Sequence, residues 1–384
     1  MKMLSKSFAP LALIICLLAA ACTGAEPGSP GSATGPSTAT TSTSRSPFEP
    51  TTTPKPPDTT GPLIAYRAAD EIGLVEGTSV VATAKGSFTP SNDLITSDDG
   101  KFVFARTTDN QLATIEVATG QGSTRPVTVG PAVGTGGGSA VVWWEQPNRL
   151  MRLDLADPQA QPELAQIVDL PPVAGVRPGD PRLLIARGGT AVIARVEAPP
   201  SPFGGPDTLY AVRGPGPPTP LGQADANSPV SVARLSPDGA SLSYALYRAT
   251  DAACGTAAVV TSDANGTQQT FDVAAADVNA GFRVTKLWWP MAGPPKLSLT
   301  TWECGQPQTY PPVVWQLSGD HIAQTTPPTS ALQTADVAPG QRALILPRSD
   351  TPTDPAGSLV FEESSRRISI KGDVDAIAVI PPSP

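Results

Sequence analysis

Side chains that commonly perform enzymatic chemistry are scarce in this sequence. The single histidine, His321, directly follows Ser318-Gly319-Asp320, a stretch that is typical of a hairpin turn. A Ser–His–Asp relay brings together residues from distant parts of a chain, whereas these groups are neighbours in sequence. The sequence also contains no G-x-S-x-G, H-E-x-x-H, P-loop or C-x-x-C motif. We therefore assign no catalytic residue, no metal ligand and no cofactor.

Composition and charge narrow the class of protein. The chain has 45 Pro and 35 Gly, which break helices and mark turns, so many short strands are favoured over long helices. Its 34 acidic residues outnumber 26 Lys and Arg, and the pI is about 4.8. A surface of this sign repels phosphate groups, so we do not expect nucleic acid as a partner.

The N-terminus carries the clearest targeting signal. An apolar stretch over residues 8–21 follows two lysines, and it is too short to span a bilayer but fits the core of a signal peptide. It ends in Leu18-Ala19-Ala20-Ala21-Cys22, which resembles the lipobox of bacterial lipoproteins, with Ala19 where that pattern prefers Leu. The resemblance implies a signal peptide over residues 1–21, a lipid on Cys22, and anchoring to the extracytoplasmic face of the cell membrane. Ordinary signal-peptide cleavage, with Cys22 as an unmodified thiol, is the alternative.

Residues 22–61 have the composition of a disordered tether. From Thr23 to Gly61, 30 of 39 residues are Ser, Thr, Pro or Gly, and Phe48 is the only large apolar side chain. Such a segment cannot bury enough surface to offset the entropy lost on ordering. We expect it to space a folded domain, residues 62–384, from the membrane. Its Thr/Pro clusters resemble glycosylated stalks of actinobacterial proteins, and the Ala/Pro-rich usage resembles that of a mycobacterium.

The folded part repeats one unit, in which a short apolar strand, a tight turn and a strongly apolar strand precede one or two further strands. The best copy spans residues 230–247 and turns at Ser236-Pro237-Asp238-Gly239, where Pro presets φ and Gly accepts a positive φ. A second copy spans residues 94–104 and turns at Asp98-Asp99-Gly100. These turns before apolar strands resemble the PD40, or TolB-like, repeat of the WD40-like β-propellers.

Weaker copies extend the repeat along the chain. The spacings between turns run from roughly 38 to 58 residues, which brackets the ~40–50 typical of propeller blades. Six turns open six blades, and three strands near the start lack an innermost partner that residues 374–380 would supply. We predict an all-β fold: a β-propeller, with seven blades, closed by pairing of its N- and C-terminal strands; six or eight blades are the alternatives. The weaker copies turn at Gly136-Gly137-Gly138, Gly179-Asp180-Pro181, Gly293-Pro294-Pro295 and Pro339-Gly340-Gln341.

Two cysteines, Cys254 and Cys304, lie in the predicted propeller. Each follows the second strand of its blade, in blades 5 and 6, and equivalent loops of neighbouring blades meet on the same face. In an oxidising compartment we expect these thiols to form a disulfide that joins the two blades. Two separately buried thiols are the alternative.

The loops between second and third strands are short in blades 2 and 3 but long in blades 4 to 7. A rigid scaffold that carries long loops commonly uses them for binding, so we predict a contact face for a protein or a glycan. Insertions without a function are the alternative. The long loops span residues 198–207, 249–255, 303–312 and 348–357, and the candidate contact residues are Phe203, Tyr247, Asp251, Trp302, Glu303, Tyr310, Arg348, Asp350 and Asp354.

Two adjacent tryptophan pairs, Trp143-Trp144 and Trp288-Trp289, fall on apolar strands. Neighbouring residues on a strand point to opposite faces, so we expect each pair to pack against the blades on both sides. A ligand platform is the alternative.

These features predict a monomeric, lipid-anchored propeller that acts as a non-catalytic scaffold for an envelope protein or another ligand. TolB-like propellers act as interaction platforms, which is what the resemblance implies. The alternative is an extracytoplasmic propeller enzyme or sugar-binding protein that uses carboxylates in its central channel, because paired acids perform glycoside chemistry. No such pair stands out in the sequence, and Asp98-Asp99-Gly100 fits a solvated turn better than a Ca²⁺ site.

Overall fold

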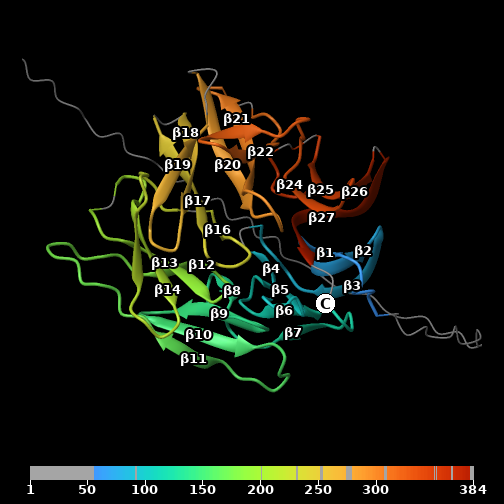
Figure 1. Ribbon diagram of the computed structural model, residues 1–384, viewed down its shortest axis with the longest axis horizontal. Helices are drawn as coiled ribbons and strands as arrows, with labels where there is room; N and C mark the ends of the chain where they lie inside the picture. Colours follow the sequence, from blue (N-terminus) through green and yellow to red (C-terminus); the bar gives the residue numbers. More distant parts are fainter. Residues whose placement is uncertain are drawn as a thin grey trace, which may run out of the picture. The chain divides into compact units, whose positions relative to one another are not determined.

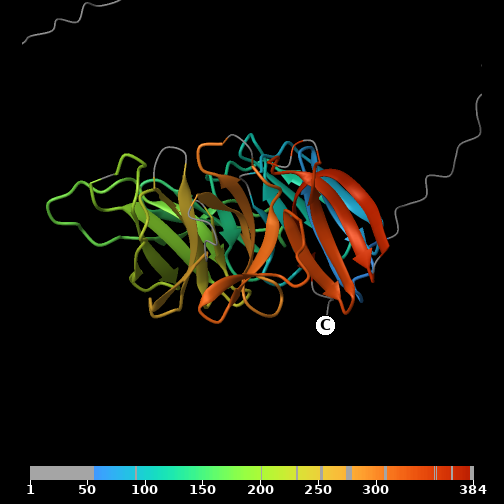
Figure 2. The ribbon, with the colours of Figure 1, turned by 90° about the horizontal axis from the view of Figure 1, so that it is seen from above.

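The computed structural model describes residues 56–380, apart from residues 91–92, 200, 231, 251–253, 274–278, 307–308, 350, 352 and 365. The named elements of this part are all β-strands, arranged in sheets around a central axis (Figure 1). The strands run between two faces that carry the loops (Figure 2). Within the described residues, no helix has the length and apolar character needed to cross a membrane.

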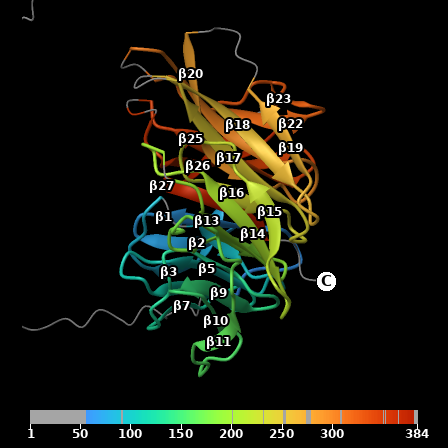
Figure 3. The same cartoon turned by 90° about the vertical axis from the view of Figure 1, so that its left-hand side faces the viewer.

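Five four-stranded antiparallel sheets follow one another along the chain and form blades 2 to 6. In each blade the first strand lies nearest the axis, and the strands of blades 4 and 5 face the viewer in Figure 3. Blade 2 contains β4 (Leu94–Thr96), β5 (Phe102–Arg106), β6 (Leu112–Glu116) and β7 (Gly122–Arg125); blade 3 contains β8 (Val133–Thr135), β9 (Ala140–Glu145), β10 (Arg149–Asp154) and β11 (Glu163–Ile167). Blade 4 contains β12 (Arg182–Arg187), β13 (Thr190–Val196), β14 (Asp207–Arg213) and β15 (Thr219–Gln223); blade 5 contains β16 (Ala233–Leu235), β17 (Leu242–Ala249), β18 (Gly255–Ser262) and β19 (Gln268–Asp272). Blade 6 contains β20 (Ala280–Trp288), β21 (Lys296–Glu303), β22 (Val313–Ser318) and β23 (His321–Gln324).

The sixth sheet has seven strands and contains both ends of the described chain. Its last strand, β27 (Arg366–Ile380), pairs with β26 over residues 366–374 and with β1 over residues 374–380. The first half of β27 therefore completes blade 7, and the second half supplies the innermost strand of blade 1. The other members are β1 (Leu63–Ala68), β2 (Glu71–Glu76), β3 (Ser79–Lys85), β24 (Gln333–Ala338), β25 (Gln341–Pro347) and β26 (Gly357–Glu363).

The pairing expected between the first and last strands is present in this sheet. Leu63 lies opposite Ile380 and Tyr66 lies opposite Ile377 in an antiparallel register, and Figure 1 shows β27 directly beside β1. With the two halves of β27 counted separately, the described strands form seven four-stranded blades. The packed chain begins before β1, because Pro57 is buried and the Asp58 N–H donates to Glu76 at 3.3 Å.

Most of the predicted turns lie between the first and second strands of their blades. In blade 5, Gly239 has a φ of +71° and its N–H donates to the Ser236 carbonyl at 2.9 Å. The prediction for blade 4 is wrong, because Gly179-Asp180-Pro181 precedes the first strand, β12. The turn of that blade is formed by Gly188 and Gly189, which have φ values of +56° and +74°. The predicted turn contains a proline, and a proline ring does not allow positive φ values.

The core lies between neighbouring blades. Trp143 packs in an apolar cluster with Phe104 of blade 2, whereas Trp144 packs with Ile193 of blade 4, which confirms the packing expected for this pair. The second pair behaves differently. Trp288, the last residue of β20, packs in a buried cluster and also lines a central cavity, and Trp289 lines the same cavity.

Candidate functional site

Long loops between second and third strands gather on one face, which we call the loop face. Because the strands of each blade are antiparallel, every second-to-third connection emerges on the same side. The connections span residues 197–206, 304–312 and 348–356 in blades 4, 6 and 7. The expectation of a long loop in blade 5 is wrong, because its connection, residues 250–254, is no longer than that of blade 2, residues 107–111. Two of the predicted contact residues, Asp251 and Asp350, lie outside the described residues, as does the predicted lipidation site Cys22.

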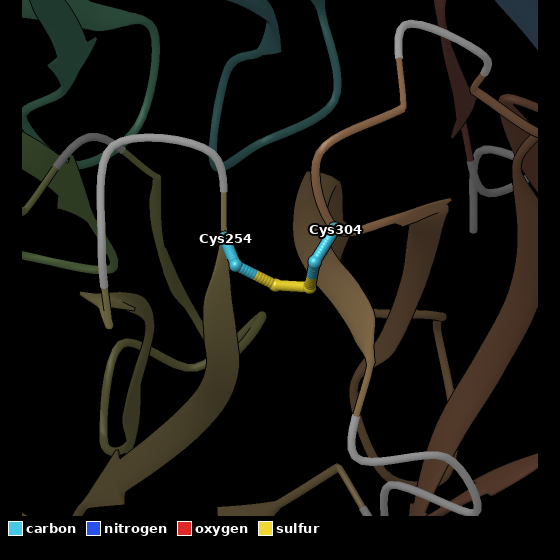
Figure 4. The surroundings of a disulfide bond; sticks show 2 residues. All are labelled: Cys254 and Cys304. Atoms are coloured by element: carbon cyan, nitrogen blue, oxygen red, sulfur yellow. A yellow bond between two sulfur atoms is a disulfide. The ribbon is translucent and has the colours of Figure 1, made fainter.

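A disulfide joins two loops on this face. Cys254 directly precedes β18 of blade 5 and Cys304 directly follows β21 of blade 6 (Figure 4), with 5.1 Å between their Cα atoms. The Cys304 N–H also donates to the Asn279 carbonyl at 2.7 Å, which fixes the loop against the start of β20. The bond crosslinks positions 50 residues apart and restrains both blades at the point where their loops leave the sheet.

A hollow of about 510 Å³ lies beside these loops, and we call it the loop-face hollow. Its lining includes Phe203 from the loop of blade 4, Tyr247 from β17 and Arg283 from β20. Phe203 is 53% exposed, which is unusual for so large an apolar side chain. The hollow therefore combines a concave surface with an exposed aromatic ring.

Tyr247 is held in place from two sides. The Arg283 guanidinium carbon lies 4.8 Å from the centroid of the Tyr247 ring, within the range of a cation–π contact. On the neighbouring strand, a Cβ added to Gly255 would lie 2.5 Å from the Tyr247 Cζ, so only glycine leaves room for the ring. The packed ring gives the hollow a rigid wall.

Blade 6 contributes three of the predicted residues, but none of them lines the hollow. Trp302 lies opposite Gly281 in the strand register, and its ring occupies the space that a side chain at position 281 would need. Glu303 is exposed, and Tyr310 is 44% exposed with its N–H bonded to the Thr301 carbonyl at 2.8 Å. Glu303 and Tyr310 therefore form a separate exposed group on the loop face.

Blade 7 contributes an ion pair rather than separate charges. Arg348 lies 2.8 Å from the Asp354 carboxylate and also pairs with Asp373 of β27. Because the two predicted contact residues bind each other, their charges are largely satisfied within the chain. The structure thus divides the predicted contact face into the hollow with Phe203 and Tyr247, the group on blade 6, and this pair.

Two contributors to the hollow had no signal in the sequence. Arg283 belongs to the first strand of blade 6, and residues 227–229 connect β15 to β16. Their role depends on how β17 packs against β20, which a repeat pattern does not reveal.

The acidic residues of the central cavity are engaged in ion pairs. Asp93 lies 2.6 Å from Arg234, and Asp336 lies 2.7 Å from Lys296. Asp98 accepts hydrogen bonds from the Thr135 hydroxyl and from the backbone of blades 3 and 4. No group of three or more metal-ligating side chains occurs in the part of the chain that the structure describes.

Similarity to known proteins is found among solved structures, at low sequence identity. No protein-family model and no curated protein matches the sequence. The chain is similar to apo AztD from Citrobacter koseri, at 9% identity over 83% of this chain and 97% of that chain, with a TM-score of 0.43. It is also similar to the Cps50 (Swd1) β-propeller domain of Myceliophteria thermophila, at 9% identity over 76% of this chain and 91% of that chain, with a TM-score of 0.46. A putative TolB from Agrobacterium tumefaciens is similar at 10% identity over 83% of this chain and 98% of that chain, with a TM-score of 0.38.

Proposed function

We propose that this protein is a cell-envelope lipoprotein whose β-propeller is a non-catalytic scaffold that binds a protein partner through the loop face. The observation that carries the proposal is the loop-face hollow, where exposed Phe203 lies beside the Tyr247–Arg283 stack. Aromatic and Arg side chains around a concave surface have the composition of interaction hot spots. The hollow suits a partner segment that inserts an apolar or aromatic side chain.

The scaffold is prepared for binding before a partner arrives. The Cys254–Cys304 disulfide restrains the loops of blades 5 and 6, and the close contact with Gly255 fixes the Tyr247 ring. A surface that is already ordered loses less conformational entropy on association, so more of the contact energy contributes to affinity.

Site-specific photo-crosslinking in living cells tests this proposal. A photoreactive phenylalanine analogue at position 203 is expected to capture one protein partner. The same analogue at His321, the 57% exposed first residue of β23, is expected to capture none, because the turn that precedes it emerges on the opposite face. Equal capture at both positions, or capture at position 321 alone, would remove the loop face as the contact surface.

A substitution pair measures how much Phe203 contributes. Phe203→Ala should weaken partner binding by about tenfold or more, as truncation of a hot-spot aromatic does. Ile167→Ala is the matched control, since Ile167 is a similarly exposed apolar side chain (55%) on the outer strand of blade 3. If both variants bind the partner equally, Phe203 is an ordinary surface residue.

The membrane anchor is a separate part of the proposal, supported by the lipobox-like sequence that ends at Cys22. Cys22→Ala should release the protein from the membrane fraction, and the intact mass of membrane-extracted wild-type protein should include the lipid. Cys16→Ala is the matched control, because Cys16 lies within the predicted signal peptide. An unmodified Cys22 in the membrane-extracted protein would contradict the anchor without affecting the loop face.

A further inference from the structure

The central cavity lies where the innermost strands of the blades converge. One part has a volume of about 170 Å³, and a second part of about 350 Å³ shares four lining residues with it, namely Pro90, Asp93, Arg234 and Lys286. A buried water needs ~10–15 Å³ of such space, so the smaller part alone has room for about ten non-hydrogen atoms. The cavity therefore has room for a small molecule.

Lys286 is the only lysine that lines this cavity among the described residues. Its ammonium nitrogen is buried, and none of the described residues offers it a hydrogen-bond partner. The residue lies in β20 at a register irregularity between Val284 and Lys286, and such bulges re-aim side chains. A buried ammonium without a partner is costly, which makes this group a marker of a binding site.

The carboxylates that interact electrostatically with Lys286 are already paired with arginines. Asp375 lies 2.8 Å from Arg67, and Asp93 lies 2.6 Å from Arg234. Burial lowers the pKa of Lys286 to about 8; Asp375 and Asp93 oppose this effect, whereas Arg67 and Arg234 add to it. At neutral pH the lysine is protonated, and this set of five charges leaves one positive charge uncompensated.

Two further side chains of the smaller part carry hydrogen-bond donors that have no partner among the described residues. The indole N–H of Trp288 and the Nε–H of Arg187 are buried without a partner among the described residues, and both side chains line the smaller part. The lining acids of that part, Asp93 and Asp336, are engaged in ion pairs. The cavity thus offers positive charge and donors, and the complementary ligand is an acceptor with negative charge.

The rest of the wall is apolar. Ile95, Leu235 and Ile377 line the smaller part of the cavity, together with the Trp288 ring. The Trp289 ring is fixed beside them, because its N–H donates to the Arg234 carbonyl at 3.3 Å. An inorganic anion would leave these surfaces without contacts, whereas an organic acid covers them.

We propose that the central cavity binds a small organic carboxylate, whose charged group pairs with the Lys286 ammonium and accepts from the Trp288 indole, while its apolar body contacts Ile95, Leu235 and Ile377. This site is distinct from the loop-face hollow and does not depend on a protein partner. It also places a positive pocket inside a protein of net charge −8.

Calorimetric titration of the purified full-length protein with benzoate at pH 7 tests the proposal. Wild type should bind benzoate, and Lys286→Met should bind it about tenfold more weakly or worse, as expected for loss of a charge-assisted hydrogen bond. Lys286→Arg retains the charge and should recover most of the affinity. Lys101→Met is the matched control, since Lys101 has a 70% exposed side chain outside the cavity and should leave binding unchanged.

Two further arms separate the ligand classes. Neutral benzamide should bind wild type at least about tenfold more weakly than benzoate, and benzoate affinity should fall above pH 8 as Lys286 loses its proton. Arg67, Arg234, Asp93 and Asp375 are the charged groups that face Lys286 during this titration. Three outcomes would each overturn the proposal. They are equal binding of benzoate by wild type and Lys286→Met, equal binding of benzamide and benzoate by wild type, and binding of inorganic phosphate but not benzoate.

Discussion

Arg67 and Asp375 form a buried ion pair, with 2.8 Å between Nε and Oδ1, although 308 positions separate them in the sequence. Arg67 belongs to β1 and Asp375 to β27, so the pair lies in the sheet where the two ends of the described chain meet. Their side chains are only 1% and 4% exposed. The first and last strands are therefore joined by a charge pair as well as by backbone hydrogen bonds.

Asp375→Asn should destabilise the fold strongly, because it leaves the Arg67 guanidinium buried without its counter-charge. Removal of one partner of a buried pair typically costs about 3–5 kcal/mol, which chemical unfolding monitored by tryptophan fluorescence would measure. Glu163→Gln is the control, since it breaks a pair with Arg152 that is 63% and 38% exposed, and it should cost less than about 1 kcal/mol. Similar losses in both variants would show that the buried pair has no special role.

Glu71 should stabilise the protein against acid. Burial raises the pKa of this carboxyl, but the hydrogen bonds from Lys371, Lys85 and Tyr66 have the larger combined effect. Together they lower the pKa from its ordinary 4.5 to about 2. Because the folded pKa lies below the unfolded one, the stabilisation is present above pH 4.5 and is lost as the pH falls towards 2. A pKa shift of this size corresponds to about 3 kcal/mol of unfolding free energy.

The test is the pH dependence of unfolding in Glu71→Gln. Its difference in unfolding free energy from wild type should be largest near pH 6 and should shrink steadily below pH 4.5. Glu145→Gln, at a 50% exposed side chain, is the control and should follow wild type. A difference that does not vary with pH would show that Glu71 contributes by packing alone.

Lys286→Met should make the protein more stable at neutral pH and less sensitive to alkali. The pKa of Lys286 is lowered from 10.5 to about 8, so between these values the unfolded chain holds a proton that the folded chain has released. The stability of wild type therefore rises with pH in this range, by up to about 3 kcal/mol, and the variant should lack this rise. Thermal unfolding between pH 7 and 10 measures this rise in stability. Above pH 10 the effect of Tyr244 has the opposite sign, because burial raises the pKa of Tyr244 to about 12 and stability then falls as the pH rises. Lys101→Met should retain the rise, and a parallel rise in Lys286→Met would contradict the assignment.

The Cys254–Cys304 disulfide should resist thiol reagents and stabilise the propeller. Thiol counting in denaturant without reductant should leave both cysteines unmodified, and reduction should release two thiols. Replacement of both by serine should reduce the free energy of unfolding by about 4 kcal/mol, the chain-entropy value for a closed loop of this size. Two reactive thiols before reduction would mean that the cysteines are unpaired in the protein as it is isolated.

Local patterns in the sequence were sufficient to predict the repeat, the all-β fold and most of the turns. Ser236-Pro237-Asp238-Gly239 specifies its turn through its own residues, because Gly239 adopts a positive φ and its N–H bonds to Ser236 within the turn. The apolar C-terminal segment could likewise be assigned as a partner for the first strand. Where the local pattern was ambiguous, as at Gly179-Asp180-Pro181, the prediction was wrong.

Only the tertiary structure decided which side chains share a site. Phe203 and Tyr247 line one hollow, whereas Arg348 and Asp354 neutralise each other, because loop conformation and blade packing set these distances. Lys286 shows the same limit most clearly, since nothing in the sequence around it marks it as unpaired. Within the described part of the chain its lack of a partner arises where strands distant in sequence converge and two arginines already hold the nearby carboxylates. Turns and strand alternation depend on neighbours in sequence, but an unpaired charge depends on every group that packing brings around it.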